Sequence, residues 1–173
     1  NPPWLKIEWN ESDVLGDYNP IFILRKLSAT NIVHKRKDAF DKNEILESIW
    51  FAELIEAEGV QCFLSATQNY PVMSGQKANL FKCFLPQAWM FGESQGISGF
   101  IHPEGIFEEP NGGIFRGEVY RRLIAHFQFQ NQKMLFPIAH RKRYSLNIYS
   151  SRARGDLDFI NISNLFSTKT IEE

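Results

Sequence analysis

Cysteine is scarce in this sequence, and long apolar runs are missing. The 173 residues include two cysteines, Cys62 and Cys83, which are too few for a disulfide framework and lack the spacing of metal ligands. No stretch approaches the roughly 20 apolar residues that span a bilayer, and no signal peptide opens the sequence. We therefore expect a soluble cytoplasmic protein with no membrane partner and no metal site.

An excess of charge of either sign is also missing. The formal net charge is −1, with 23% charged and 43% hydrophobic residues, which is the balance of a globular protein. Because phosphate neutralisation requires clustered Lys and Arg, this balance argues against a protein that binds DNA by charge alone, although a local basic patch stays compatible with it. Aromatic residues reach 14%, and we expect most of them in the core.

Common catalytic clusters are absent as well. The four histidines are scattered, and none joins a cysteine or carboxylate at metal-ligand spacing. Glu104, Glu108 and Glu109 form a carboxylate set, but the downstream Glu-x-Lys that a PD-(D/E)xK nuclease requires is not there. We interpret this segment as an acidic, solvated loop.

Hydrophobic spacing predicts alternating helices and strands. Apolar residues at three- and four-residue spacing indicate helices, and short apolar or alternating runs indicate strands. The predicted helices cover 21–29, 44–64, 78–91 (with Pro86 inside) and 114–126, and the predicted strands cover 97–102, 127–130, 144–150 and 159–162. This order is typical of an α/β sheet that ends in an antiparallel pair.

The sharpest motif is Asn1-Pro2-Pro3-Trp4. It resembles the Asn/Asp/Ser-Pro-Pro-aromatic signature of enzymes that methylate an exocyclic amine. The resemblance implies that Asn1 and the Pro2 carbonyl accept the two N6 hydrogens of adenine, which turns the nitrogen lone pair toward the methyl donor. The prolines stiffen the loop, and Trp4 stacks on a base flipped out of the duplex. The alternative is an ordinary proline-rich loop with an aromatic anchor.

Three later segments follow in the order of the same family. Segment 77–84 (KANLFKCF) and segment 96–103 (GISGFIHP) resemble its next helix and strand. The step Phe136-Pro137 resembles a later motif, which implies that Phe136 covers the other face of the target base. The run Arg141, Lys142 and Arg143 supplies candidate contacts to the DNA backbone, although a charge run at the end of a hairpin is equally typical of solvated surface.

Together these motifs are similar to adenine-N6 DNA methyltransferases. Segment 4–29 is similar to BREX-type phage-defence enzymes and to fused restriction-methylase subunits, which implies restriction-modification or phage defence. The implied partner is double-stranded DNA, and the implied methyl donor is S-adenosylmethionine. The implied fold is a partial Rossmann-like methyltransferase sheet with a terminal antiparallel strand.

One part of the family pattern is not matched. The strand and Gly-rich turn that bind the donor should precede the Pro-Pro loop, whereas Gly92, Gly96 and Gly99 precede a predicted strand. We therefore expect residues 1–155 to be the C-terminal half of a catalytic domain and 156–173 to be a tail or the start of the next region. Alone, this half should be inactive, should not bind S-adenosylmethionine, and should self-associate through its exposed sheet edge.

Two other functions fit the same residues. A non-catalytic remnant or protein-interaction domain of methyltransferase ancestry would keep the fold without the reaction. Methylation of a protein or RNA amine is a further alternative, because the same Pro-Pro loop also serves glutamine and guanine amines.

Overall fold

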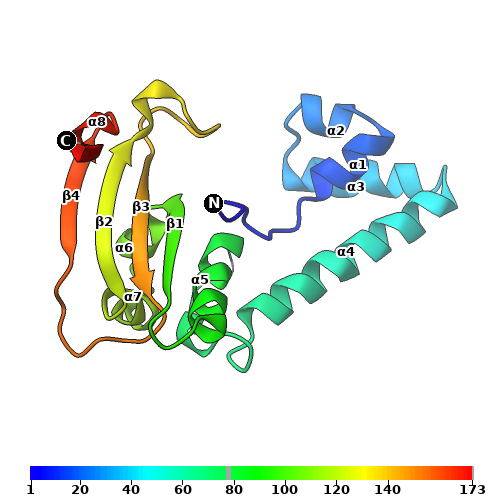
Figure 1. The fold of residues 1–173 in the computed structure, drawn as a ribbon. Helices are drawn as coiled ribbons and strands as arrows, with labels where there is room; N and C mark the ends of the chain where they lie inside the picture. The colour runs from blue at the N-terminus through cyan, green and yellow to red at the C-terminus, as the bar shows by residue number, and fades with distance from the viewer. Residues whose placement is uncertain (77–78, 173) are drawn as a thin grey trace. The chain divides into compact units, whose positions relative to one another are not determined.

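The chain divides into two compact units. A computed structural model describes residues 1–76 and 79–172 (Figure 1). The helical unit comprises Ile7–Phe63, and the sheet unit comprises Asn1–Lys6 together with the chain from Leu64 onward. Residues Ile160–Leu165 form a strand at the edge of the sheet, where the sequence predicts one over 159–162.

The helical unit is built from amphipathic helices with polar caps. Its elements are α1 (Glu11–Tyr18), α2 (Ile21–Leu24), α3 (Ala29–Phe40) and α4 (Glu44–Ser65), the last of which ends in the sheet unit. Asn10 caps α1 by accepting from the backbone N–H of Ser12, and Ser28 caps α3. The buried core consists of Leu15, Phe22, Ala39, Leu46 and Trp50.

The structure confirms one helix prediction for this unit and corrects another. The predicted helix 44–64 is confirmed by α4. The predicted helix 21–29 is wrong beyond Leu24, because Lys26 takes a positive φ of 44°, which a right-handed helix cannot accommodate. The structure also contains α1, which the sequence analysis did not predict.

The sheet unit holds a mixed four-stranded sheet with helices before, within and after it. Its elements are η1 (Pro71–Met73), α5 (Leu80–Phe91), β1 (Ile97–Pro103), α6 (Gly105–Glu108), α7 (Gly113–Tyr120), β2 (Leu123–Gln130), η2 (Asn131–Lys133), β3 (Arg143–Ser150), β4 (Ile160–Leu165) and α8 (Lys169–Glu172). Residue 78 of the predicted helix 78–91, and residues 77 and 78 of the motif 77–84, lie outside the described residues.

The strand order is β1-β3-β2-β4. β3 is antiparallel to both β1 and β2, so β1 and β2 run in the same direction, and β4 is parallel to β2. The predicted α/β class and its antiparallel strand are confirmed. The terminal position of that strand is wrong: β3 lies in the interior of the sheet, because it pairs along its length with a strand on each side.

One predicted boundary is also wrong. The helix expected over 114–126 ends at Tyr120, and β2 begins at Leu123. Leu123 pairs with Tyr149 of β3, and both side chains are fully buried. Pairing and burial in the sheet therefore override the helical spacing that the local sequence shows.

The two faces of the sheet differ in polarity because successive strand residues point to opposite sides. One face carries the apolar cluster of Phe129, Tyr144 and Leu165, against which Trp4 and Phe136 pack. On the other face, Ser145, Asn147 and Tyr149 of β3 are fully buried. Figure 1 shows α6 and α7 behind the sheet. Among the described residues, none of the helices is both long and apolar enough to cross a membrane.

Candidate functional site

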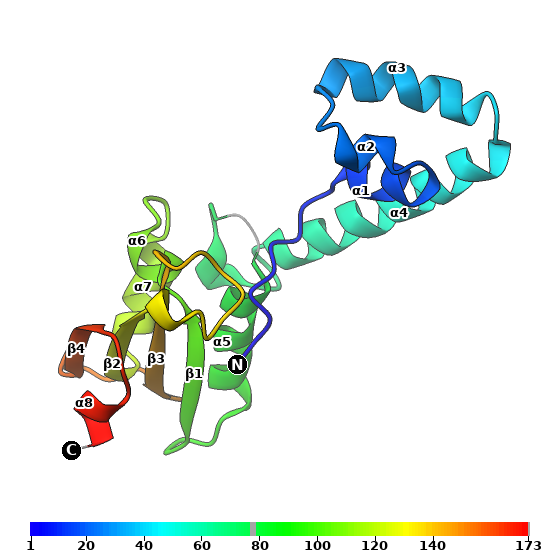
Figure 2. The same ribbon diagram turned by 90° about the horizontal axis from the view of Figure 1, so that it is seen from above.

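A cavity of about 680 Å³ opens at the carboxyl end of β1. We call it the Trp4 cavity. Figure 2 shows the first residues of the chain and the connection from β2 to β3 at this end of the sheet. The residues of its wall that bear on function are Trp4, Asn79, Phe81, Lys82, Glu104, Glu108, Glu109, Arg141, Lys142 and Arg143. In sheets with parallel strands, ligands bind at the carboxyl ends of those strands.

Trp4 is held firmly on the sheet. Its indole Nε1 donates to the Ile101 carbonyl of β1 at 3.1 Å. The Phe136 ring lies 4.5 Å from the indole, centroid to centroid, at an interplanar angle of 30°, and Tyr144 lies 6.2 Å away. The structure therefore brings Trp4 and Phe136 together.

The two rings nevertheless touch each other and leave no slot between them. A base stacked between two rings needs roughly 7 Å from one ring plane to the other, because each stacking contact takes about 3.5 Å. The Trp4 and Phe136 centroids are 4.5 Å apart. The rings must separate before a base can lie between them, whereas the Trp4 cavity is open in this structure.

The other residues of the Pro-Pro motif are placed differently from Trp4. Asn1 and Pro3 are exposed and Pro2 is buried. Trp4 is the motif residue that lines the cavity among the described residues, so Asn1 is not in its wall. The motif is fastened to α5, since the Leu80 N–H donates to the Leu5 carbonyl at 3.0 Å.

The predicted DNA-backbone residues lie at the same cavity. Arg141, Lys142 and Arg143 are exposed and line it, although nearly the whole chain separates them from Trp4. Arg143 forms an ion pair with Glu108. Arg141 and Lys142 are therefore the better candidates for a phosphate.

A deeper cation in the wall is already neutralised. Lys82 is 4% exposed, and its Nζ forms an ion pair with Glu109 and donates to Gln76 Oε1 at 3.0 Å. The buried ammonium is stabilised because the Glu109 carboxylate compensates its charge and Gln76 accepts one of its hydrogen bonds.

A buried polar network underlies the cavity, and the sequence analysis missed it. Asn147 Oδ1 accepts from His126 Nδ1 at 2.7 Å, and Asn147 Nδ2 contacts His102 Nε2 at 3.0 Å. Tyr149 Oη lies 2.9 Å from the same His102 nitrogen. The available signal was the alternation of polar residues along β2 and β3, which places them on one face.

Glu104 belongs to this network and corrects one prediction. It is 5% exposed, with Oε2 accepting from Gln128 Nε2 at 2.7 Å. The predicted acidic, solvated loop is therefore wrong at Glu104, while Glu108 is exposed as predicted. Residues 105–108 form the short helix α6, which turns Glu104 toward β2.

His102 is the most strongly perturbed histidine of the network. Burial lowers its pKa to about 4, with the nearby His126 acting in the same direction and the hydrogen bond to the Pro103 carbonyl opposing them. With Nδ1–H donating to Pro103 at 2.9 Å, Nε2 is left to accept from Tyr149 and Asn147. Burial and the Glu104 charge raise the pKa of Tyr149, so this hydroxyl stays a donor.

We predict that His102 makes folding dependent on pH. An unfolded histidine binds its proton near the ordinary pKa of 6.5, whereas folded His102 does so only near 4. Its contribution is present above the unfolded pKa and is lost as the pH falls toward the folded one. Between about pH 7 and pH 5 the free energy of unfolding should fall by about 2 kcal/mol.

Urea unfolding at the two pH values measures this effect. His102→Gln should remove most of the fall, while His140→Gln, which alters an exposed residue, should leave it intact. A wild-type stability that does not change across this window would show that His102 is not buried as the structure places it.

Asn131 is a second residue that the sequence analysis missed. It is 1% exposed, and its side chain makes three hydrogen bonds to the turn that carries Phe136. The amide Nδ2 donates to the carbonyls of Phe136 and Ile138 at 3.0 and 2.8 Å, and Oδ1 accepts from the Phe136 N–H at 3.2 Å. Asn131 therefore fixes the position of the Phe136 ring beside Trp4.

We predict that Asn131→Ala releases this turn. Three hydrogen bonds are lost, and buried backbone groups lose their partner, so the free energy of unfolding should fall by about 1–3 kcal/mol. Hydrogen exchange should show faster exchange of the Phe136 amide. Asn161→Ala, at an exposed asparagine of β4, should change neither quantity, and unchanged exchange at Phe136 in Asn131→Ala would contradict the assignment.

The glycines near α5 serve packing. A Cβ atom added at Gly92 or at Gly96 would collide with the side chain of Ser151. Both positions are therefore explained by the close approach of α5 and the following turn to the end of β3. Neither glycine leaves space beside it in which the phosphate or ribose of a nucleotide could bind.

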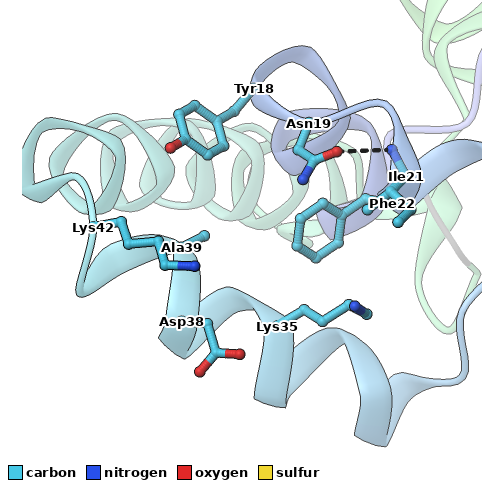
Figure 3. A pocket seen from close by; sticks show the side chains of 8 residues that line it. All are labelled: Tyr18, Asn19, Ile21, Phe22, Lys35, Asp38, Ala39 and Lys42. Atoms are coloured by element: carbon cyan, nitrogen blue, oxygen red, sulfur yellow. Dashed lines mark hydrogen bonds between the residues drawn. The ribbon is translucent and has the colours of Figure 1, made fainter.

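A smaller cavity of about 210 Å³ lies in the helical unit (Figure 3). Its asparagine, Asn19, uses Oδ1 to accept from the Ile21 N–H at 3.1 Å, which secures the start of α2. The charged side chains around it, Lys35, Asp38 and Lys42, are exposed. None of the residues that line this cavity is a buried acid, base or nucleophile. The Trp4 cavity is therefore the stronger candidate for a functional site.

Comparisons with other proteins do not assign a function, so a functional assignment rests on the residues of this chain. The sequence matches no protein-family model, and a search of curated proteins finds no match. Within the described part of the chain, no group of three His, Cys, Asp or Glu side chains is placed to hold a metal ion.

Proposed function

We propose that this chain is the acceptor-binding part of a DNA adenine-N6 methyltransferase. The observation that carries the proposal is the Trp4 cavity, because it joins the aromatic of the Pro-Pro motif with the basic run Arg141–Arg143. These two features are far apart in the sequence, and the sequence alone predicts a DNA contact for each of them. A nucleotide needs both an apolar surface for its base and cations for its phosphate.

The cavity suits a single nucleotide taken out of a duplex. Trp4 and Phe81 supply flat apolar walls, and Arg141 and Lys142 lie exposed at its wall, where a phosphate can reach them. An enzyme that modifies a base cannot reach its target atom inside a duplex and must extrude the nucleotide. The base enters the cavity, and the phosphate stays outside in contact with the basic run.

Asn1 and Pro2 then act on the exocyclic amine. The N6 lone pair of adenine is delocalised into the ring and is a weak nucleophile. Two preorganised acceptors, the Asn1 side-chain carbonyl and the Pro2 backbone carbonyl, hold the two N6 hydrogens and orient the lone pair toward the methyl group. Because Asn1 is outside the wall of the Trp4 cavity, the adenine moves from the cavity to the Pro-Pro loop before transfer.

S-adenosylmethionine would supply the methyl group. Gly92 and Gly96 pack against Ser151 and are not donor ligands in this proposal, so we place the donor site outside the described residues. Restriction-modification or phage defence is the proposed biological setting.

Binding of an extrahelical adenine by this chain tests the proposal. A fluorescent duplex with one adenine opposite an abasic site is compared with the same duplex carrying a paired adenine, by anisotropy. We expect the duplex with the extrahelical adenine to bind at least about tenfold more tightly. Its adenine is already unpaired, so binding does not include the unpairing energy of a few kcal/mol. Trp4→Ala should abolish the difference, and Trp9→Ala, in the core of the helical unit, serves as the control.

The alternative functions give different results in the same assay. A protein-interaction domain binds neither duplex with a preference for the extrahelical adenine. An enzyme acting on RNA or protein shows no such preference for DNA. Equal affinity for the two duplexes, or no binding to either, would contradict the proposed function.

A further inference from the structure

Glu104 is a buried carboxylate in the wall of the Trp4 cavity. Its Oε2 accepts from Gln128 Nε2 at 2.7 Å, whereas its Oε1 is buried and has no hydrogen-bond partner among the described residues. Nearly all buried polar atoms in proteins have a partner, and an unpaired one costs about 1–3 kcal/mol. Oε1 is enclosed in this structure, so the Glu104 side chain shifts toward the cavity before an N–H donor of a ligand there can satisfy it.

The surroundings fix the orientation of this carboxylate. His126 Nε2 lies 3.7 Å from Glu104 Oε2, and the His126 ring is itself held by Asn147 at 2.7 Å. The Asn147 amide in turn donates to the Ser145 hydroxyl at 2.8 Å. The bond to Gln128 engages one of the two equivalent carboxylate oxygens and leaves the other without a hydrogen-bond partner among the described residues.

Two cations of the cavity wall are engaged by other carboxylates. Lys82 pairs with Glu109, and Arg143 pairs with Glu108. Each of these two cations therefore has a carboxylate partner other than Glu104. A neutral N–H donor from a ligand can reach Oε1 without competing with either ion pair.

We propose that Glu104 reads the exocyclic amine of the base in the Trp4 cavity and thereby selects adenine. The proposal rests on the proposed function, which places an extrahelical adenine there. Glu104 accepts one N6 hydrogen while the base is in the cavity, before the amine moves to Asn1 and Pro2. Hypoxanthine has a carbonyl oxygen in place of the amine, and its lone pairs would face the carboxylate.

Two extrahelical bases of the same shape test this selection. Fluorescence anisotropy compares duplexes that carry adenine or hypoxanthine opposite an abasic site. Wild-type protein should bind the adenine duplex about tenfold more tightly, because a hydrogen bond to a charged group is gained in one case and replaced by repulsion in the other.

Glu104→Gln makes the test sharper. Gln128 Nε2 still requires an acceptor, so the new amide should present its oxygen to Gln128 and its NH₂ group where Oε1 lay. The cavity then offers a donor, and the preference should shift from adenine toward hypoxanthine. Glu108→Gln is the matched control: it changes an exposed carboxylate of the same wall and should keep the preference for adenine.

The outcomes separate the two proposals. Equal binding of adenine and hypoxanthine by wild-type protein would overturn the role of Glu104, and this comparison requires no variant. A preference that survives unchanged in a folded Glu104→Gln protein would overturn it too. If extrahelical adenine binds no better than paired adenine, the proposed function itself fails, whatever the behaviour of Glu104.

Discussion

Replacing Asn1 by Ala should lower methylation turnover by about 10²–10³-fold in the proposed methyltransferase. The substitution removes one of two preorganised acceptors at the reacting nitrogen, and losing one such partner typically has an effect of this size. Binding of S-adenosylmethionine should hardly change, because Asn1 contacts the acceptor base. Single-turnover transfer of labelled methyl groups to plasmid DNA measures the rate.

The control for Asn1 is another exposed asparagine. Asn111→Ala removes a side chain of the same chemistry from a loop of the sheet unit that does not line the Trp4 cavity. Its turnover should equal that of the wild type. Normal turnover of the Asn1→Ala enzyme would show that the Pro-Pro loop takes no part in the reaction.

Phe136→Ala should fail in a different way, by weakening DNA binding. The ring lies 4.5 Å from Trp4 and 4.7 Å from Tyr144, centroid to centroid, so its loss leaves Trp4, the aromatic wall of the cavity, less well held and weakens the contact between Trp4 and the base. One base–aromatic contact contributes about 1–3 kcal/mol, which corresponds to about 5- to 150-fold in affinity. Anisotropy with the extrahelical-adenine duplex measures this loss.

Leu135→Ala is the matched control for Phe136. Leu135 precedes Phe136 in the same turn but is 66% exposed, so its removal should leave the DNA affinity unchanged. If both variants bind the duplex as tightly as the wild type, Phe136 does not contribute to base binding and acts as a packing residue for Trp4 alone.

The main elements of the sheet unit were predictable from local pattern. The apolar run 97–102, bounded by Gly96 and Pro103, predicted β1, and the alternation of 144–150 predicted β3. The order of the strands was not predictable in the same way. The interior position of β3 depends on pairing between segments distant in sequence, which periodicity does not contain.

The residues of the candidate site were predictable only where they belong to a sequence motif. Trp4, Phe136 and the basic run were found from their resemblance to a family, and the structure places them close together. Glu104 and Asn131 were missed because their roles come from burial and tertiary hydrogen bonds. Glu104 stands in the sequence beside other acidic residues, and nothing local distinguishes it from exposed Glu108.

Mass spectrometry of DNA nucleosides tests the central claim most directly. The natural gene that encodes this chain is expressed in a host without adenine methylation, and the DNA is digested to nucleosides. Our account predicts N6-methyldeoxyadenosine with the wild-type gene and a near-complete loss of it with Asn1→Ala. The account is contradicted if N6-methyldeoxyadenosine is absent, or if its amount is unaffected by Asn1→Ala.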